Sequence, residues 1–269
     1  MAHPNGLFSW TDLALPDPGE GSRFYTELFG WTAADRQGPA DEYGYTVFAK
    51  DGKPVAGLGP LPADALEPGI PPMWTSYVAV DDLAATVERW TAAGGSVLTP
   101  PMVIPSAGEM AVVADPEGAV LALWQAGEHA GAELFDAPGS LIWNELNTRD
   151  SAAARGFYGE VFGWGFERFA GGDAPAEYWL ITLDKPAGGP WAEDPYNGGI
   201  LTMDDGWPAE VPAHWMVYFH VADIDETIAR LERLGGSVSV PAFDTPVGRM
   251  AVVGDPQGGT FSIIAPPSR

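Results

Sequence analysis

The chain has 269 residues, of which 46% are apolar and 12% aromatic, so it can bury the core of one large domain or two ordinary ones. Its formal net charge of −24, with no cluster of Lys and Arg, disfavours nucleic acid and anionic membrane surfaces as partners. The absence of cysteine excludes disulfides, thiolate metal sites and cysteine nucleophiles, which leaves four histidines, the carboxylates and neutral oxygens as possible ligands.

Targeting signals are not evident in this sequence. No window approaches the length of an apolar membrane span, and the opening residues MAHPNGLF lack both the basic start and the apolar run of a secretory signal. We therefore expect a soluble, cytoplasmic protein without a membrane partner. The oligomeric state, monomer or dimer, is left open by the sequence.

The first predicted element is a strand over SWTDLAL (9–15), in which residue types alternate. A helix follows, because Asp17 is a suitable N-cap, Pro18 fits the first helical position and Gly30 fits a left-handed end. Short strands are then predicted over 45–49 and 54–58. The pattern starts again with a strand at WTSYVAV (74–80), a helix after Asp82, and strands over 110–114 and 120–124.

The second half of the chain repeats the first. RFYTELFGW (23–31) returns as GFYGEVFGW (156–164), and WTSYVAVDD from Trp74 returns as WMVYFHVAD from Trp215. GEMAVVADPEG (108–118) likewise returns as GRMAVVGDPQG (248–258). A weaker repeat inside each half brings the number of units to four, each reading as a strand, a helix and about three strands.

These units predict an α+β fold of four βαβββ modules that form two cupped mixed β-sheets with the helices packed outside. The first predicted domain covers 1–126, with modules at about 5–60 and 72–126. Residues 127–139 are a linker, and the second domain covers 140–269, with modules at about 140–204 and 213–266. The repeated aromatic phrase belongs to packing rather than chemistry in this interpretation, because Phe24, Leu28 and Phe29 fall on one helical face.

Four such modules, the pattern Asp-x(6)-Phe-Tyr-x(3)-Phe-Gly-Trp and a DPxG hairpin near the end of each half resemble the vicinal oxygen chelate superfamily. This group includes glyoxalase I, bleomycin and fosfomycin resistance proteins and extradiol dioxygenases. The Phe-Gly-Trp ending is also similar to tandem actinobacterial proteins labelled hydroxylases or glyoxalase-like antigens. The resemblance covers nearly the whole chain and implies two cups that bind small molecules.

The resemblance also implies where a metal ion would be held. Metal-dependent members of the family carry one ligand seven residues before the helix-capping Asp and another in a D-P-x-G-x-x-x-E pattern. In this chain the corresponding residues are Trp10, Thr75, Trp143, Met216, Ala122 and Ser262. None is a usual ligand for a hard cation, so we expect neither a metal site nor another cofactor.

Carboxylates stand two residues beyond two of these tryptophans. Asp12 and Glu145 share a strand face with Trp10 and Trp143 by the period of two, and a carboxylate beside an indole is a candidate general base. A carboxylate at a rim, or bonded to a neighbouring strand, is the commoner alternative. His220 is the third catalytic candidate, although a lone histidine on a strand is more often structural.

The candidate ligand-binding residues follow from the same strands. They are Trp10, Thr75, Tyr77, Trp143, Asn147, Met216, Tyr218 and Ser262. The second half is expected to be the more polar, because Ala79 stands in the first half where His220 stands in the second.

Two functions that involve a small molecule remain open from the sequence, beside a third possibility, an interaction module presented at a surface. One is a metal-independent small-molecule-binding protein that sequesters or senses a metabolite or an antibiotic. The alternative is a metal-independent enzyme, a lyase, isomerase or hydroxylase, that uses a cup carboxylate as its general base. Whether the chain is an enzyme is not decided by these residues.

Overall fold

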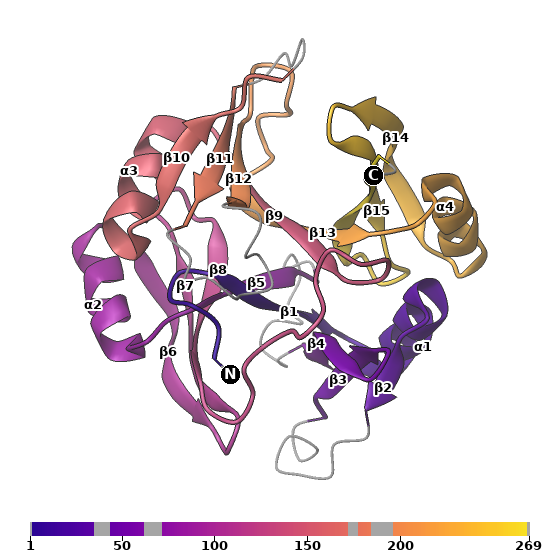
Figure 1. The fold of residues 1–269 in the computed structure, drawn as a ribbon, viewed down its shortest axis with the longest axis horizontal. Helices are drawn as coiled ribbons and strands as arrows, with labels where there is room; N and C mark the ends of the chain where they lie inside the picture. The colour runs from indigo at the N-terminus through magenta and orange to yellow at the C-terminus, as the bar shows by residue number, and fades with distance from the viewer. Residues whose placement is uncertain (1, 35–43, 62–71, 172–176, 184–195, 268–269) are drawn as a thin grey trace. The chain divides into compact units, whose positions relative to one another are not determined.

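The computed structural model describes residues 2–34, 44–61, 72–171, 177–183 and 196–267 (Figure 1). Its helices are α1 (Pro18–Phe29), α2 (Leu83–Ala92), α3 (Ser151–Phe162) and α4 (Ile224–Arg233). Its strands in the first half are β1 (Phe8–Leu15), β2 (Thr32–Ala34), β3 (Thr46–Lys50), β4 (Lys53–Pro60), β5 (Trp74–Ala79), β6 (Ser96–Ile104), β7 (Gly108–Ala114) and β8 (Val120–Ala126). Those in the second half are β9 (Leu141–Thr148), β10 (Gly165–Arg168), β11 (Tyr178–Thr182), β12 (Tyr196–Thr202), β13 (His214–His220), β14 (Ser237–Thr245), β15 (Gly248–Gly254) and β16 (Thr260–Ala265).

The order of elements confirms the predicted α+β fold. Each module reads strand, helix and three strands, and the strands form two eight-stranded sheets ordered β2-β3-β4-β1-β5-β8-β7-β6 and β10-β11-β12-β9-β13-β16-β15-β14. Both sheets are mixed, because β1 pairs with β4 and β9 with β12 in parallel, whereas the hairpins within each module are antiparallel. Crossover helices account for the parallel pairs.

All four helices begin at the predicted capping aspartates, whereas only α1 and α3 end at a left-handed glycine; α2 and α4 end at Ala93 and Leu234. The side chain of Asp17 accepts a hydrogen bond from the backbone N–H of Glu20 at 2.9 Å, and Asp82, Asp150 and Asp223 cap the other helices in the same way. Gly30 closes α1 in the left-handed conformation, at φ 66°, as predicted. Each module therefore fixes its own helix through local signals.

Contacts divide the chain into two compact units that do not follow the halves of the sequence. Unit 1 comprises Met1–Trp10, Thr75–Gly131 and Trp143–Met216, and unit 2 comprises Thr11–Trp74, Ala132–Ile142 and Val217–Arg269. In unit 1, α2 packs against α3; in unit 2, α1 packs against α4 (Figure 1). Each unit has its own apolar core, formed by segments from both halves. The predicted sequence domains 1–126 and 140–269 stay a prediction.

The repeated aromatic phrase lies in these cores. Phe24, Leu28 and Phe29 are buried in unit 2, and their counterparts on α3 are buried in unit 1, which confirms the packing role. The tyrosine of the phrase also makes hydrogen bonds, which the apolar residues beside it in the sequence did not indicate. Tyr25 and Tyr158 are fully buried, and each anchors a hydrogen-bonded triad.

The two triads have the same members in the same geometry. In unit 1 the Tyr158 hydroxyl donates to Asp115 Oδ2 at 2.9 Å and accepts from Trp215 Nε1 at 3.0 Å. In unit 2 Tyr25 donates to Asp255 Oδ2 at 2.8 Å and accepts from Trp74 Nε1 at 3.1 Å. Each aspartate belongs to a DPxG turn, so the triad joins a turn of one module to a helix of another.

Burial sets the ionisation of these groups. It raises the pKa of the Asp115 carboxyl, although the backbone N–H groups of Ala119 and Glu117 and the Tyr158 hydroxyl donate to it. Burial, and next the charge of Asp115, raise the pKa of Tyr158 well above its ordinary value. The pKa of Tyr25 is raised in the same way, first by burial and then by Asp255. Both tyrosines are therefore protonated donors at neutral pH.

Candidate functional site

Three side chains of β9 point away from the core of unit 1. Trp143, Glu145 and Asn147 alternate with Asn144 and Leu146, and Leu146 is completely buried in the core. The carboxylate residue Glu145 is 7% exposed and the amide residue Asn147 is 2% exposed. A strand that buries both an acid and an amide on the side away from its core has a polar surface that can bind a ligand.

Tyr178 of β11 lies over the same surface. Its hydroxyl accepts a hydrogen bond from Trp143 Nε1 at 2.8 Å. Gly199 of β12 stands opposite Glu145 in the parallel register, and a Cβ atom added to Gly199 would overlap the Tyr178 hydroxyl, at 2.0 Å. Gly199 thus leaves the space that the Tyr178 ring occupies. We call Trp143, Glu145, Asn147, Tyr178 and Gly199 the β9 face.

Asn147 differs from the other buried amides of unit 1. Asn144 Oδ1 accepts from the Ser76 hydroxyl at 2.7 Å. Asn197 uses both ends of its amide, accepting from the backbone N–H of Phe8 and donating to the carbonyl of Gly6. The Oδ1 atom of Asn147 is buried and has no hydrogen-bond partner within the described part of the chain. The hydrogen-bonding capacity of this oxygen is therefore unused within the described chain.

The strands beside β9 add no positive charge to this face. The register places Leu201 opposite Asn147, Leu180 opposite Gly199 and Glu167 opposite Leu180. Among the described residues that this register brings to the β9 face, none is Lys or Arg. The described part of this face therefore offers hydrogen-bond acceptors and a carboxylate.

The equivalent part of β1, in unit 2, is simpler. The Tyr45 hydroxyl donates to Asp12 Oδ2 at 3.0 Å, and Gly57 opposite Asp12 leaves room for that ring. Ala14 occupies the position that corresponds to Asn147. We call Asp12, Ala14, Tyr45 and Gly57 the β1 face; it keeps the acid, the tyrosine and the glycine but has no amide.

Trp10 does not form an open aromatic wall. Its ring is 3% exposed and meets the imidazole of His129 edge-on, with ring centroids 4.6 Å apart. His129 also packs against Trp124, 5.8 Å away, and Trp124 in turn packs against Tyr77. His129, which the sequence assigned to a linker without a role, thus covers the indole in unit 1.

The remaining sequence-predicted residues lie on β5, β13 and β16. Thr75 and Met216 are half-buried residues of unit 1. In unit 2, Tyr218 pairs with Ser262, whose buried hydroxyl has no hydrogen-bond partner within the described chain. His220 Nδ1 lies 3.5 Å from Asp136 Oδ1. The structure therefore brings Trp143, Glu145 and Asn147 together in one unit, and Tyr218, His220 and Ser262 together in the other.

Tyr178 and Gly199 were missed by the sequence-based prediction of the site. A signal for Tyr178 existed, since it stands 133 residues after Tyr45, the same separation as Trp143 from Trp10. The glycines carried no such signal, because the loops before them differ in length. Their role appears only when the tyrosine ring is seen to lie over them.

The donors at the family's metal positions do not fit a divalent cation. Trp10 and Trp143 offer an indole N–H, Met216 a thioether and Ala122 a methyl group. Within the described ranges there is no group of three or more His, Asp or Glu side chains close enough to hold a metal ion.

No described helix is long and apolar enough to cross a membrane.

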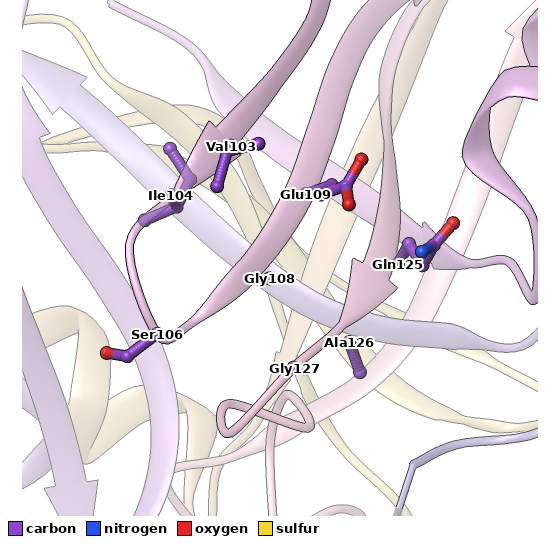
Figure 2. A pocket seen from close by; sticks show the side chains of 8 residues that line it. All are labelled: Val103, Ile104, Ser106, Gly108, Glu109, Gln125, Ala126 and Gly127. Atoms are coloured by element: carbon purple, nitrogen blue, oxygen red, sulfur yellow. The ribbon is translucent and has the colours of Figure 1, made fainter.

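A shallow pocket lies elsewhere in unit 1, at the end of the β6–β7 hairpin (Figure 2). It has a volume of about 200 Å³, and its lining includes Val103, Ile104, Glu109 and Gln125. Gln125 Oε1 already accepts from the backbone N–H of Leu83 at 2.7 Å, where it supports the start of α2. The pocket contains none of the predicted site residues, so the β9 face remains the candidate.

A family model and several relatives match most of this chain. A family model described as Glyoxalase/Bleomycin resistance protein/Dioxygenase superfamily matches residues 7–123 and 140–263. "Putative glyoxylase CFP32" of Mycobacterium tuberculosis is 39% identical over 265 residues, covering 97% of this chain and 95% of that protein. "Anthracycline biosynthesis protein DnrV" of Streptomyces peucetius is 39% identical over 271 residues, covering 96% and 93%.

Solved structures share the fold at low sequence identity. The Mn(II)-bound glyoxalase from Novosphingobium aromaticivorans aligns with a TM-score of 0.61 at 13% identity, covering 98% of this chain and 83% of that one. The 2,2',3-trihydroxybiphenyl 1,2-dioxygenase from Sphingomonas wittichii strain RW1 also reaches 0.61, at 15% identity, covering 97% and 91%. These likenesses establish the fold alone.

Proposed function

Since the chain belongs to the glyoxalase/bleomycin resistance protein/dioxygenase superfamily, we propose that it binds a small organic molecule on the β9 face and does so without the family's metal ion. The observation that carries the proposal is the buried polar pair Glu145 and Asn147, on the strand face that also carries Trp143, whose indole N–H donates to Tyr178. Ligand sites combine apolar and aromatic walls with a few polar groups, and this face has that composition.

The metal-free part of the proposal rests on donor chemistry. A divalent ion of this family chelates two substrate oxygens through open coordination positions, and that requires nitrogen or oxygen ligands. The side chains at Trp143 and Met216 supply neither a carboxylate nor an imidazole. Binding then depends on hydrogen bonds and ring contacts, as in members of the family that sequester a drug.

The relatives suggest a class of ligand. Two curated relatives are named for anthracycline biosynthesis, and an anthracycline is a flat polycyclic aromatic molecule. The Trp143 and Tyr178 rings give the β9 face aromatic surface for such a molecule. The net charge of −24 would further attract a cationic ligand such as an amino-sugar anthracycline.

The test is binding by the apo protein in the presence of EDTA. An anthracycline and a panel of flat aromatic compounds are titrated, with tryptophan fluorescence and thermal unfolding as readouts. Gly199→Ala displaces the Tyr178 hydroxyl and should weaken binding at least about tenfold. The matched variant Gly57→Ala displaces Tyr45 on the β1 face and should leave affinity unchanged. Binding that appears only after a divalent metal is added, or that fails in Gly57→Ala instead, contradicts the proposal.

An enzyme remains the second candidate, because Glu145 is a buried carboxylate beside an indole. In that role Glu145 removes a proton from the bound molecule. Asp12, held by Tyr45, and His220, near Asp136, are the corresponding candidates in unit 2. Glu145→Gln should abolish turnover of a bound compound and leave its affinity within about threefold if the residue is a base. A sequestering protein consumes none of the bound compound, with or without this substitution.

A further inference from the structure

The pocket at the end of the β6–β7 hairpin contains a carboxylate that its surroundings do not pair. Val103, Glu109 and Gln125 form one row across β6, β7 and β8, because Glu109 is in register with both of the others (Figure 2). Glu109 is partly buried, and its carboxylate makes no salt bridge or hydrogen bond with another residue in the described ranges. Of the described residues that line the pocket, none is Lys, Arg or His.

The equivalent place in unit 2 contains a cation from the protein itself. The sequence repeat puts Arg249 of β15 where β7 has Glu109. It also puts Asp225, in the first turn of α4, where α2 has Ala84. Arg249 Nη1 donates to Asp225 Oδ2 at 3.0 Å, so a guanidinium joins the hairpin to the helix. Unit 1 also has an acid here, on the strand rather than on the helix, but its described residues supply no cation for it.

The same row reaches the first turn of α2. Gln125 Oε1 accepts a hydrogen bond from the backbone N–H of Leu83 at 2.7 Å, which fixes the orientation of the amide. Because this oxygen is already engaged, the Glu109 carboxylate is the strongest acceptor that the lining side chains offer to a ligand.

The size and the apolar lining of the pocket narrow the class of ligand. Ile104 lines it, and Val103, which is 66% exposed, stands beside Glu109. The volume of about 200 Å³ is smaller than the roughly 300–1,000 Å³ of sites for drug-sized molecules. A short aliphatic chain with a charged end matches these features, with the charge at Glu109 and the chain against the two apolar residues.

We propose that this pocket binds a small organic cation, an alkylguanidinium or alkylammonium, with Glu109 as its counter-ion. The net charge of −24 attracts cations to the molecule in general, and the apolar lining favours those with an aliphatic chain. No residue of the β9 face lines the pocket, so the inference goes beyond the proposed function and does not depend on it.

Four probes of similar size test the charge requirement on the full chain. They are n-butylguanidinium and n-butylammonium, the uncharged n-butylurea and the anion butyrate. NMR titrations of the backbone amides, at about 0.15 M salt to screen unspecific attraction, follow β6, β7 and β8. The two cations should shift the amide signals around Glu109 with dissociation constants on the order of 1 mM. Butylurea and butyrate should bind at least about tenfold more weakly.

A matched pair of variants separates the pocket from the total charge. Glu109→Gln keeps the shape of the side chain and removes its charge, so the affinity for both cations should fall at least about tenfold. Glu160→Gln removes the same charge from an exposed position on α3 of the same unit. This control should leave the affinity within about twofold, and the spectra without ligand check that both variants are folded.

A third variant reproduces the arrangement of unit 2. Glu109→Arg combined with Ala84→Asp places a guanidinium on β7 and an acid on α2, so the protein should supply its own cation. Binding of butylguanidinium should then be lost while the midpoint of thermal unfolding stays the same or rises.

The source of the cation is decided by one further probe, an acetylated and amidated Gly-Arg-Gly peptide. Binding of this peptide at least as tight as that of butylguanidinium supports a site for an arginine side chain of another protein. Much weaker binding supports a site for a free amine or guanidine.

Three results overturn the proposal. They are equal binding of butylurea and the cations, an affinity that Glu109→Gln leaves unchanged, and a loss in Glu160→Gln as large as that in Glu109→Gln. Gly199→Ala, which changes the β9 face, should leave cation binding in the pocket unchanged. Failure of this pocket and failure of the proposed function are therefore observed separately.

Discussion

The β1 face and the β9 face carry two copies of the same sequence pattern. They differ in one functional group, because the β9 face has the amide of Asn147 where the β1 face has Ala14. Both have an acid on the strand, a tyrosine lying over a glycine and a tryptophan two residues before the acid. On the β1 face Tyr45 donates to Asp12, and Ala14 stands two residues beyond that acid. The β9 face replaces Ala14 by Asn147 and leaves that amide without a partner among the described residues.

The buried triads, unlike the two strand faces, are the same in both copies. Tyr25 with Asp255 and Tyr158 with Asp115 have hydroxyl to carboxylate distances of 2.8 and 2.9 Å. Packing therefore stayed alike in the two copies, while the polar strand faces diverged. A duplicated fold can change one face freely because the cores behind the two faces are built separately.

The largest effect is expected from separating the halves. Each core takes residues from both halves, so residues 1–126 alone leave the apolar sides of their helices uncovered and should not fold cooperatively. Circular dichroism and hydrogen exchange measure this. Mixing the fragments 1–126 and 127–269 should restore a cooperative transition. A stable, folded 1–126 fragment would show that the compact units do not control folding.

Removing one triad hydroxyl should cost less but remain easy to measure. Tyr158→Phe leaves the Asp115 carboxylate and the Trp215 N–H buried without that partner, so the free energy of unfolding should fall by about 2–3 kcal/mol. Tyr25→Phe should cost the same within about 1 kcal/mol, and urea titration measures both. Tyr196→Phe, at an exposed bond to Glu167, is the control and should change stability by less than about 0.5 kcal/mol. Unequal losses would break the equivalence of the triads.

The pH dependence should identify Asp115. Its pKa in the folded protein is raised by burial, so its contribution to stability is complete below the ordinary value of 3.8 and is lost as the pH rises through the folded-state pKa. The stability of the wild type relative to Asp115→Asn should therefore decline as the pH rises above about 4. Denaturant titrations at several pH values measure the difference. A difference that grows with pH in this range contradicts the assignment.

The smallest effect on stability is expected from removing the histidine that lies against Trp10. His129→Ala removes the ring that lies against Trp10, so the Trp10 indole should become accessible while stability falls by less than about 1.5 kcal/mol. Fluorine NMR of fluorotryptophan-labelled protein resolves the individual indoles. The Trp10 resonance should gain a solvent isotope shift, and His214→Ala should leave it unchanged. An unmoved resonance would mean that other groups cover this ring.

The fold was predictable because its signals are local and repeated. Asp17 and Gly30 mark the ends of α1 by their own backbone preferences, and Asp150 and Gly163 do the same for α3. The triads could not be predicted, because Tyr25 and Asp255 lie 230 residues apart and neither residue type requires such a partner.

The candidate site was predictable strand by strand. Alternation along β9 placed Trp143, Glu145 and Asn147 on one surface, whereas the unused state of Asn147 depended on what its neighbours did with their own hydrogen bonds. The contact between the Trp10 and His129 rings could not be predicted for a different reason. His129 lies in a connecting segment, where periodicity gives no information about direction.

The pairing of modules across the two halves also affects how the molecule forms. The first and last modules complete one core and the middle two complete the other, as they would if two copies of a half-length ancestor exchanged their modules symmetrically. Joining the copies through residues 127–139 turns that exchange into a unimolecular step. Closure of both cores then no longer depends on protein concentration, and the two copies can carry different residues at equivalent positions, as Ala14 and Asn147 do.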